Sequence, residues 1–309
     1  MILIVCYRIY ILNVFGFVYT DSDQTIMWLA AKNYSKGSFH EPRFYGQDYN
    51  TMLEALLAVP LLKSGIAVYK ALPIITSLLA LFPYFLISSL TYLRESKLSA
   101  VIILTIPLVL PVEYELMTCL SRGFVAGICI ASLCCVPLFY NASKRHYFFA
   151  FSTMMIAYSV NANSILFSFP CILLLFMRNY KSKHFYIYSG AGFCVGLLLH
   201  LSIAYFYILH PNYVLHSFST TYSFENLWEG LTLTDKFFNH LTPIFSKHGW
   251  MMFVFFATLS LVLFMKKKTE EGIAVLFTLF ILLLPFSASK IHDGITSVSV
   301  SYTHLTLPT

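Results

Sequence analysis

Two aspartates stand where the chain leaves its first apolar run, in the sequence Asp21-Ser22-Asp23-Gln24. The polar segment that follows, to about Gly65, brings the number of acids here to five of the fourteen in the chain. Carboxylates placed this close to hydrocarbon are costly and indicate a functional site. They can take a proton from a hydroxyl group or help to hold a divalent cation. The structural alternative is a helix cap, which is worth about 0.5–2 kcal/mol.

A second candidate is Arg122, which lies between two later apolar runs in Ser121-Arg122-Gly123. The planar guanidinium group of arginine presents a fork of N–H donors that matches a pair of phosphate oxygens. The structural alternative is an interfacial arginine that pairs with Glu113 or Glu115. Both interpretations stay open at this point.

A polar and aromatic set suited to binding a sugar or an acceptor follows the first acids. Its members are Tyr45, Gln47, Asp48, Tyr49 and Glu54. Anchoring at a membrane interface is the alternative, because tyrosine favours headgroup depth. The histidines and cysteines are weaker candidates for functional residues. The seven cysteines contain no CxxC pair and indicate small hydrophobic residues, and His200 in an apolar run indicates a hydrogen-bonded core histidine.

The elements that must position these side chains are apolar helices. Hydrophobic residues make up 58% of the 309 residues and charged residues 11%, against roughly 25% in a soluble domain. The mean hydropathy is +0.72. The apolar runs do not alternate as barrel strands do, so the sequence predicts an all-α, polytopic integral membrane protein. The net charge of +6 comes from small clusters between these runs and does not indicate nucleic-acid binding.

We expect about nine transmembrane or re-entrant helices. They cover Ile2–Val18, Ala67–Leu93, Leu98–Val112, Phe124–Tyr140, Tyr147–Val160, Asn163–Met177, Phe185–Leu209, Trp250–Met265 and Ile273–Phe286. Several are shorter than the roughly 20 residues of a full crossing, which predicts tilted or broken helices. In the first external loop, Thr25–Tyr34 and Thr51–Lys63 are expected to form interfacial helices around a polar aromatic loop.

The stretch Tyr147–Met177 is too long for one ordinary span and short for two. If the chain turns back at Asn161-Ala162-Asn163, every basic cluster falls on one side of the membrane, as the positive-inside rule requires. A hairpin is therefore predicted. It places eleven of the fourteen acids, and every long loop, on the non-cytoplasmic side.

The order of features around the first acids resembles the GT-C superfamily of polyprenyl-phosphate-sugar-dependent glycosyltransferases. The likeness is to its protein O-mannosyltransferase and aminoarabinose-transferase branch, and it covers about residues 8–66. Asp23 stands in the place of that family's loop aspartate, Ala31-Lys32-Asn33 in the place of its Ala-Arg-Asn-like helix, and Gly37 in the place of its glycine. Gln24 departs from the glutamate that is usual there.

This resemblance implies an enzyme that moves a hexose or pentose from a polyprenyl-phosphate donor to a lipid, glycan or protein acceptor, with inversion. It implies Asp23 as the general base. Asp21 would orient that base or, if a divalent cation is needed, share it with Asp23. The site would face outward from a bacterial inner membrane. The alternative function is a secondary transporter or flippase for a lipid-linked or small polar substrate, which intramembrane charges and internal repeats would favour.

Both ends of the chain carry an expectation of their own. The last ten residues, 300–309, resemble a translated sequencing-library adaptor and are expected to be non-native. Arg8 stands only eight residues into the first run, where it can snorkel, unless the run is the outer end of a longer span. We therefore expect a single transmembrane domain over residues 1–299 that is incomplete at both ends.

Overall fold

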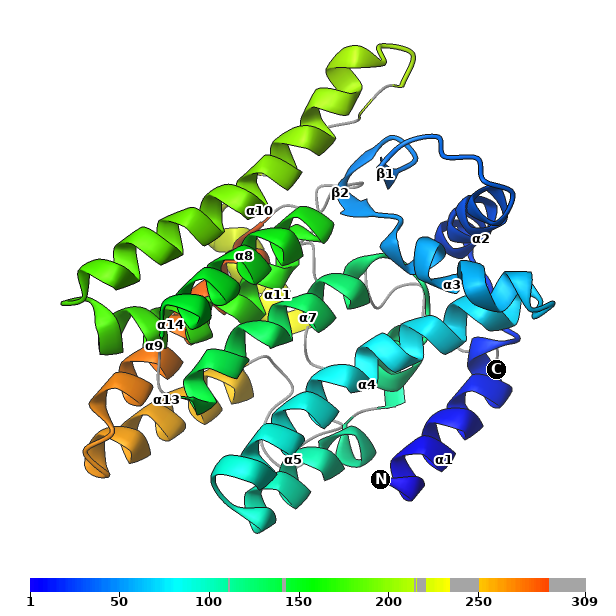
Figure 1. Ribbon diagram of the computed structural model, residues 1–309. Helices are drawn as coiled ribbons and strands as arrows, with labels where there is room; N and C mark the ends of the chain where they lie inside the picture. The colour runs from blue at the N-terminus through cyan, green and yellow to red at the C-terminus, as the bar shows by residue number, and fades with distance from the viewer. Residues whose placement is uncertain (111, 141–142, 214, 216–220, 234–249, 289–309) are drawn as a thin grey trace. The chain divides into compact units, whose positions relative to one another are not determined.

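The computed structural model describes residues 1–309 except 111, 141–142, 214, 216–220, 234–249 and 289–309 (Figure 1). The described chain is all-α and 80% helical. Contacts divide it into two compact units, Met1–Ser217 and Phe218–Thr309. Each unit is described by itself, and the predicted single domain over 1–299 stays a prediction. The expected adaptor-derived tail at 300–309 lies outside the described residues.

The first unit contains most of the helices and the one short sheet of the described residues. Its elements are α1 Ile2–Ile11, η1 Leu12–Gly16, α2 Ser22–Ser35, β1 Arg43–Phe44, β2 Gln47–Thr51, α3 Leu53–Lys63, α4 Val68–Arg94, α5 Lys97–Val109, α6 Val112–Met117, α7 Phe124–Ser132, η2 Leu133–Phe139, α8 Lys144–Val160, η3 Ala162–Ser164, α9 Ile165–Asn179 and α10 Lys183–Leu209.

The first external loop is folded around a small core of its own. Helices α2 and α3, strand β1 and the start of α4 bury an apolar cluster together, and α2 and α3 lie beside β1 and β2 in Figure 1. The predicted helices in this loop are therefore present. The loop between them contains an antiparallel hairpin that the sequence did not indicate. Its turn uses Tyr45 and Gly46, both at positive φ, a conformation that glycine adopts without strain.

The predicted hairpin at Asn161 is confirmed. Helix α8 ends at Val160, a short 3-10 turn follows, and α9 begins at Ile165. The hydroxyl of Tyr147, at the start of α8, donates to Asn179 Oδ1 at the end of α9 over 2.8 Å, so the two helices run antiparallel. Asn161 Oδ1 accepts a hydrogen bond from Asn163 N, which satisfies backbone at the turn.

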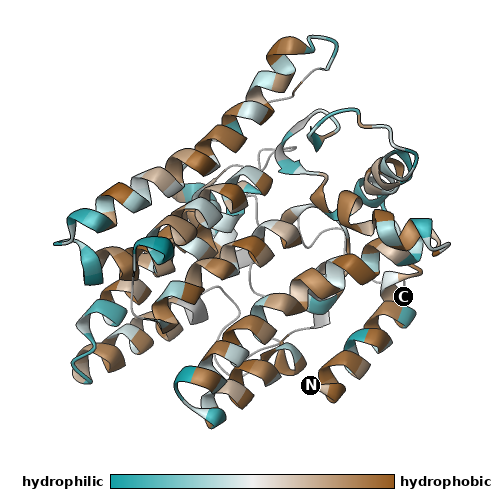
Figure 2. Cartoon of the chain, in the orientation of Figure 1, coloured by the Kyte–Doolittle hydropathy of each residue, from teal (hydrophilic) through white to brown (hydrophobic). Residues whose placement is uncertain are grey.

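The first unit has two chemically different ends. The turn from α4 to α5, the start of α8 and the turn from α9 to α10 lie away from α2 (Figure 1). We call this the basic end, because it carries seven basic residues: Arg94, Lys97, Lys144, Arg145, Arg178, Lys181 and Lys183. The loop end is the opposite end, with α2, α3 and the β-hairpin. Figure 2 shows hydrophobic residues along α4 and α10 between hydrophilic turns.

Helices α8 and α10 approach each other closely through a Gly-x-x-x-Gly pattern. A Cβ added at Gly192 would lie 2.3 Å from the carbonyl oxygen of Phe148, and one at Gly196 would lie 2.3 Å from Met155 Cβ. Ser152 Oγ donates to the Gly192 carbonyl over 3.1 Å. Small residues at this spacing let helix backbones touch, as in membrane helix pairs.

The second unit contains α11 Phe224–Leu233, α13 Trp250–Met265 and α14 Thr269–Ser287. Helices α13 and α14 form a hairpin whose turn holds Lys267 at φ 58. Ser260 Oγ donates to the Gly272 carbonyl over 2.9 Å across this hairpin. Leu231, Leu279 and Phe286 form the buried core of the unit.

The membrane prediction is borne out at a coarser level than predicted. Four helices among the described residues are long and apolar enough to cross a membrane: Val68–Arg94, Ala162–Asn179, Lys183–Leu209 and Thr269–Ser287. The other predicted runs form shorter helices, and two of them change helix type. The run Ile2–Val18 passes into the π-turn η1, and the run Phe124–Tyr140 passes into the 3-10 helix η2. The count of nine spans is therefore not confirmed.

Gly192→Ala is expected to lower the free energy of unfolding by about 1–3 kcal/mol, because the new methyl group overpacks the contact with α8. Gly190→Ala on the same helix is the matched control. It meets nothing within 4 Å, so it should be neutral or stabilise by roughly 0.5–1 kcal/mol. Thermal unfolding in detergent measures both variants. Equal stability of the two variants would contradict the close packing.

Candidate functional site

The candidate site begins where the first apolar helix gives way to α2. Helix α1 passes into the π-turn η1, after which Tyr19 stacks on Phe15 with ring centroids 4.7 Å apart. Asp21 is the N-cap of α2, and its Oδ1 accepts a hydrogen bond from Gln24 N over 3.0 Å. The cap that the sequence indicated as the structural alternative for Asp21 is therefore present.

Asp21 also forms an ion pair with Arg122 through its second oxygen, Oδ2. The partners are 101 residues apart in the sequence, and their side chains are only 12% (Arg122) and 19% (Asp21) exposed. The structure thus brings together two side chains that the sequence proposed separately. Arg122 Nε is buried and has no hydrogen-bond partner. The guanidinium group therefore keeps a donor that the ion pair does not use.

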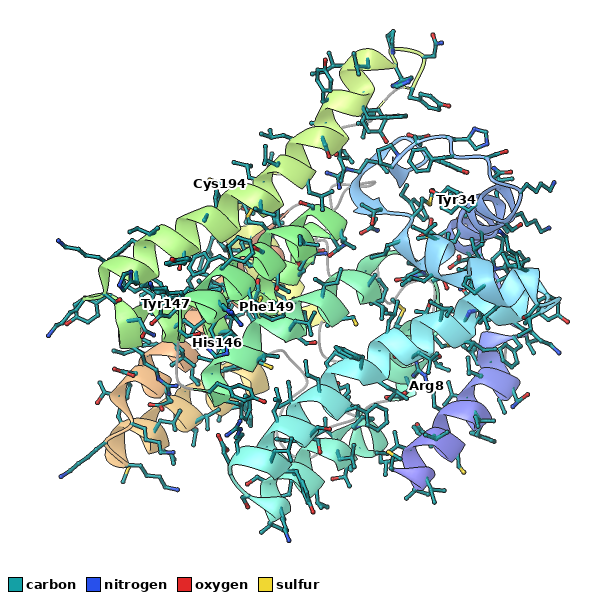
Figure 3. The ribbon with its side chains drawn as sticks, in the orientation of Figure 1. Arg8, Tyr34, His146, Tyr147, Phe149 and Cys194 are labelled. Carbon is teal, nitrogen blue, oxygen red and sulfur yellow. The ribbon has the colours of Figure 1, made fainter. Side chains whose placement is uncertain are left out.

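Glu115, one of the two acids expected to pair with Arg122, pairs with Arg8 instead. Arg8 is buried and also donates from Nη1 to Thr118 Oγ1 over 3.1 Å, so of the two alternatives for Arg8 the structure does not support snorkelling. A buried arginine requires a partner of opposite charge, and α6 supplies that partner at Glu115. Figure 3 labels Arg8 on α1.

Asp23 lies in the first turn of α2 and is half-buried. Asp23 and its charged neighbours act on the pKa of Tyr19. Burial raises the pKa of Tyr19 most, Asp21 raises it further, Arg122 lowers it and Asp23 raises it. Tyr19, Asp21, Asp23 and Arg122 therefore share one electrostatic neighbourhood, which we call the acidic corner.

The backbone at Arg122 is held by two asparagines from distant segments. Asn50 Nδ2, on β2, donates to the Arg122 carbonyl over 2.8 Å. Asn161 Nδ2, at the end of α8, donates in turn to Asn50 Oδ1. Gly123 follows at φ +87, and a Cβ there would lie 2.9 Å from Asn50 Cβ. Only glycine fits both this backbone conformation and this space.

Glu54 lies in the interior and is 0% exposed. Its Oε2 accepts from Thr76 Oγ1 over 3.1 Å, and its Oε1 accepts from Ala126 N, in the first turn of α7, over 3.3 Å. Ser121 Oγ lies 2.5 Å from Thr76 Oγ1. The carboxyl group thus binds the N-terminus of α7, next to Arg122. The prediction that Glu54 binds substrate has no support from this position.

The other predicted binding residues lie elsewhere at the loop end. Tyr45 Oη accepts from Asn33 Nδ2 over 3.3 Å. Asp48, whose side chain is 46% exposed, forms an ion pair with Arg43 over 3.3 Å. Gln47 and Tyr49 are on β2, and their side chains lie outside the described part of the structure. The described members of the set, Tyr45, Asp48 and Glu54, thus have different partners.

Arg43 and Asp48 line a cavity of about 310 Å³ that sequence reasoning missed. Tyr158, His200 and Tyr207 line it from α8 and α10. His200 Nδ1 is buried without a hydrogen-bond partner, so the expectation of a satisfied core histidine is wrong for this nitrogen. No local sequence signal connects a loop arginine with a histidine inside an apolar run, because the two line one cavity only through the packing of α10 against the loop.

The wall of this cavity is fixed by hydrogen bonds between the loop and α10. Tyr207 Oη donates to Glu41 Oε2 over 2.9 Å and accepts from Arg43 N over 3.0 Å. Arg43 Nη1 donates to the Ser159 carbonyl over 3.2 Å. The cavity therefore offers a buried guanidinium, a carboxylate and an imidazole to a ligand. Figure 1 shows the end of α10 beyond the β-hairpin.

Within the described residues, no group of three or more His, Cys, Asp or Glu side chains lies close enough to hold a metal ion. Asp21 and Asp23 remain the two predicted ligands of any divalent cation. Arg122 is the positive charge that Asp21 contacts in the structure.

Comparisons with known proteins return no match. No family model matches the sequence, and no curated protein or solved structure does so. The fold therefore defines the class of this protein by itself: an all-α protein with four candidate membrane-spanning helices among its described residues. The resemblance to the GT-C family stays a prediction.

Stability should depend on pH through Glu54. Burial raises its pKa from 4.5 to about 7, against the smaller lowering by the hydrogen bonds from Thr76 and the backbone of α7. The stabilising contribution is therefore complete below about pH 4.5 and is lost as the pH rises through 7, by roughly 3 kcal/mol at most. Glu54→Gln should flatten this decline between pH 5 and pH 8 in thermal unfolding, because an amide does not ionise.

Glu95→Gln is the control for this experiment, because Glu95 is exposed at the basic end. It should leave the pH dependence of the wild type in place. A Glu54→Gln variant that keeps the full decline would show that another group causes it.

The ion pair of the acidic corner should couple its partners energetically. In a double-mutant cycle of Asp21→Asn and Arg122→Gln, we expect a coupling free energy of about 1–2 kcal/mol, because both side chains are mostly buried. The matched control is the cycle of Arg43→Gln and Asp48→Asn, whose half-exposed carboxylate predicts less than about 1 kcal/mol. Equal coupling in the two cycles would contradict this ranking.

Proposed function

We propose that this protein is a membrane glycosyltransferase that moves a sugar from a polyprenyl-phosphate donor to a lipid, glycan or protein acceptor. The observation that carries the proposal is the acidic corner, where Asp23 and an arginine held by Asp21 both act on Tyr19. A base and a phosphate-binding cation are the two groups that this transfer requires. The resemblance of residues 8–66 to the GT-C family agrees with it.

In this mechanism Asp23 is the general base. An acceptor hydroxyl is a weak nucleophile, and a carboxylate within hydrogen-bond reach takes its proton as the oxygen attacks the anomeric carbon. The bond from that carbon to the phosphate oxygen breaks, and the lipid phosphate leaves with the electron pair. One carboxylate acting on the acceptor gives inversion.

Arg122 stabilises the departing phosphate. Its guanidinium carries a permanent positive charge, and its buried Nε keeps an unused donor. Asp21 has both oxygens engaged, with Gln24 N and with Arg122, so it serves as a positioning residue. In this proposal Asp21 is the second carboxylate of the site, and its role is to hold the arginine. A glutamate at the position of Gln24 is then not required.

We assign the cavity beside Arg43 to the sugar or the acceptor. Its volume of about 310 Å³ is at the small end of ligand cavities. Its polar lining offers both donors and acceptors to hydroxyl groups. Asp48 keeps its predicted binding role in this place, and Tyr158, His200 and Tyr207 join it.

The proposal includes a topology of about nine tilted or broken spans. The basic end then faces the cytoplasm by the positive-inside rule, and the loop end with the acidic corner faces outward. A bacterial inner membrane fits this arrangement.

A transporter or flippase is the alternative function, and the buried Arg8–Glu115 pair is the observation that favours it. Charges buried between apolar helices can move ions or polar substrates. The pair lies between α1 and α6, and the glycosyltransferase proposal uses it only as a structural contact.

Asp23→Asn should reduce sugar transfer by about 100-fold or more in the full-length protein, because an amide does not accept the proton. The measurement follows radiolabelled sugar from a panel of polyprenyl-phosphate-linked hexoses and pentoses into lipid, glycan and protein fractions of proteoliposomes. Asp21→Asn should lower transfer less, through a misplaced Arg122. Glu95→Gln, at the opposite end, should leave transfer unchanged.

Normal transfer by both aspartate variants would overturn the proposal. A transporter predicts the opposite pattern: substrate uptake without any glycan product, lost in Arg8→Gln and kept in Asp23→Asn. One set of vesicles and four variants therefore distinguishes the two functions.

A further inference from the structure

The basic end of the first unit contains a large cavity that the proposed reaction does not use. Its volume is about 670 Å³. It is lined by Arg94 at the end of α4, by η2, by His146 at the start of α8 and by Arg178 at the end of α9. Three basic side chains from three separate helices therefore converge on one hollow. Figure 3 labels His146 on α8.

The surroundings of this cavity are strongly positive. The stretches 86–103, 143–151 and 172–190 carry the seven basic residues of the basic end and a single acid, Glu95. Among the described residues, no carboxylate forms an ion pair with Arg94. An excess of cations held this close together requires anions to neutralise it, and the cavity is where an anion can enter.

Aromatic contacts hold the basic groups in place before any ligand arrives. The Arg94 guanidinium lies over the ring of Tyr140, 4.3 Å from its centroid. Tyr140 stacks on His146 with centroids 5.7 Å apart. A guanidinium stacked through its face still presents N–H donors at its edge, in the geometry that suits phosphate oxygens. The site is therefore preorganised for an anion with several acceptor oxygens.

A second cavity of about 580 Å³ shares His146 with the first. Its walls include Val136, Phe148 and Phe149, with Lys144 and Arg145 at its edge. Figure 3 labels Phe149 beside His146. A polar hollow next to an apolar one fits a molecule with a charged head and a hydrocarbon tail. A free phosphate ion would use only the first cavity.

The site also lies where a lipid headgroup is found. Two helices that end at the cavity, α4 and α9, are candidate membrane spans. Exposed Tyr92 and Tyr180 lie in the last turn of α4 and just past the end of α9, at the depth that tyrosine favours at an interface. Basic pockets between membrane helices on the cytoplasmic side bind anionic headgroups.

We propose that this pair of cavities binds an anionic phospholipid of the cytoplasmic leaflet. Its phosphate lies between Arg94, His146 and Arg178, and an acyl chain lies along Phe148 and Phe149. The lipid joins the ends of α4, α8 and α9, and it stabilises the basic end of the first unit. The proposal rests on the membrane orientation of the proposed function, but no residue of the acidic corner takes part, so the two fail separately.

The test measures lipid retention by the full chain in phosphatidylcholine nanodiscs, using native mass spectrometry while dioleoyl-phosphatidylglycerol is added. Arg94→Gln with Arg178→Gln should weaken its binding by roughly 10- to 30-fold, because two charges are removed from the headgroup site. The matched control is Lys97→Gln with Lys183→Gln, which removes the same charge at the same end outside the cavity lining. It should change binding less than about threefold.

Two competitors distinguish the source of the phosphate. Inorganic phosphate and glycerol 3-phosphate at millimolar concentration should not displace the lipid, because neither has an acyl chain. Displacement by either would overturn the lipid assignment in favour of a small anion. Equal losses in the two double variants would also overturn the site, because diffuse charge would then explain the binding. If the Arg94 and Arg178 double variant does not fold, Arg178→Gln alone, at an exposed side chain, gives the same comparison against Lys183→Gln.

Discussion

The loop end of the first unit depends on one buried carboxyl group. Glu54, on α3, has no exposed surface and binds the first turn of α7 and Thr76 on α4. An unpaired carboxylate in the interior would be costly, so the backbone donors of α7 are required for this packing. The donors in turn fix where α7 begins, and Arg122 and Gly123 are the residues immediately before it. The position of the candidate site therefore follows from a fully buried group.

The rest of the acidic corner is connected to this contact through Arg122. Asn50, which is held by Asn161, donates to the carbonyl of Arg122, and Asp21 pairs with its guanidinium group. Asp21 also caps α2, so one carboxylate connects the start of the first loop with a segment a hundred residues further along. A shift of Glu54 would be transmitted to Arg122 through the start of α7. From there it would pass through the Arg122–Asp21 ion pair to the start of α2, where Asp23 lies. Structure and chemistry at this end are consequently difficult to separate in any single substitution.

The two ends of the unit use charge in different ways. At the loop end, Arg122 pairs with Asp21 mostly out of water, and Arg43 pairs with the half-exposed Asp48, which fixes the geometry of both arginines. At the basic end, an excess of cations is arranged on aromatic rings around a hollow, which leaves charge for a ligand. Between them, α8 and α10 are joined through small residues, where close backbone contact replaces side-chain packing. The apolar helices thus hold apart a region of mixed, partly paired charges and a region with an excess of positive charge.

The amino-acid sequence by itself determined the helical elements and the turn at Asn161, because hydrophobic runs and basic clusters are local patterns. It also indicated that the chemistry-bearing acids gather in the first loop, and that Asp21 was suited to cap a helix. It did not predict the β-hairpin, whose turn depends on Tyr45 and Gly46 at positive φ. It assigned Glu54 to a ligand, since burial is a property of packing and not of the residue. Only the tertiary structure decided that Asp21 pairs with Arg122, that Glu115 pairs with Arg8 and that His200 and Arg43 line one cavity. The members of each pair are distant in sequence. A charged residue type does not reveal which opposite charge it will pair with, because that depends on how the helices pack.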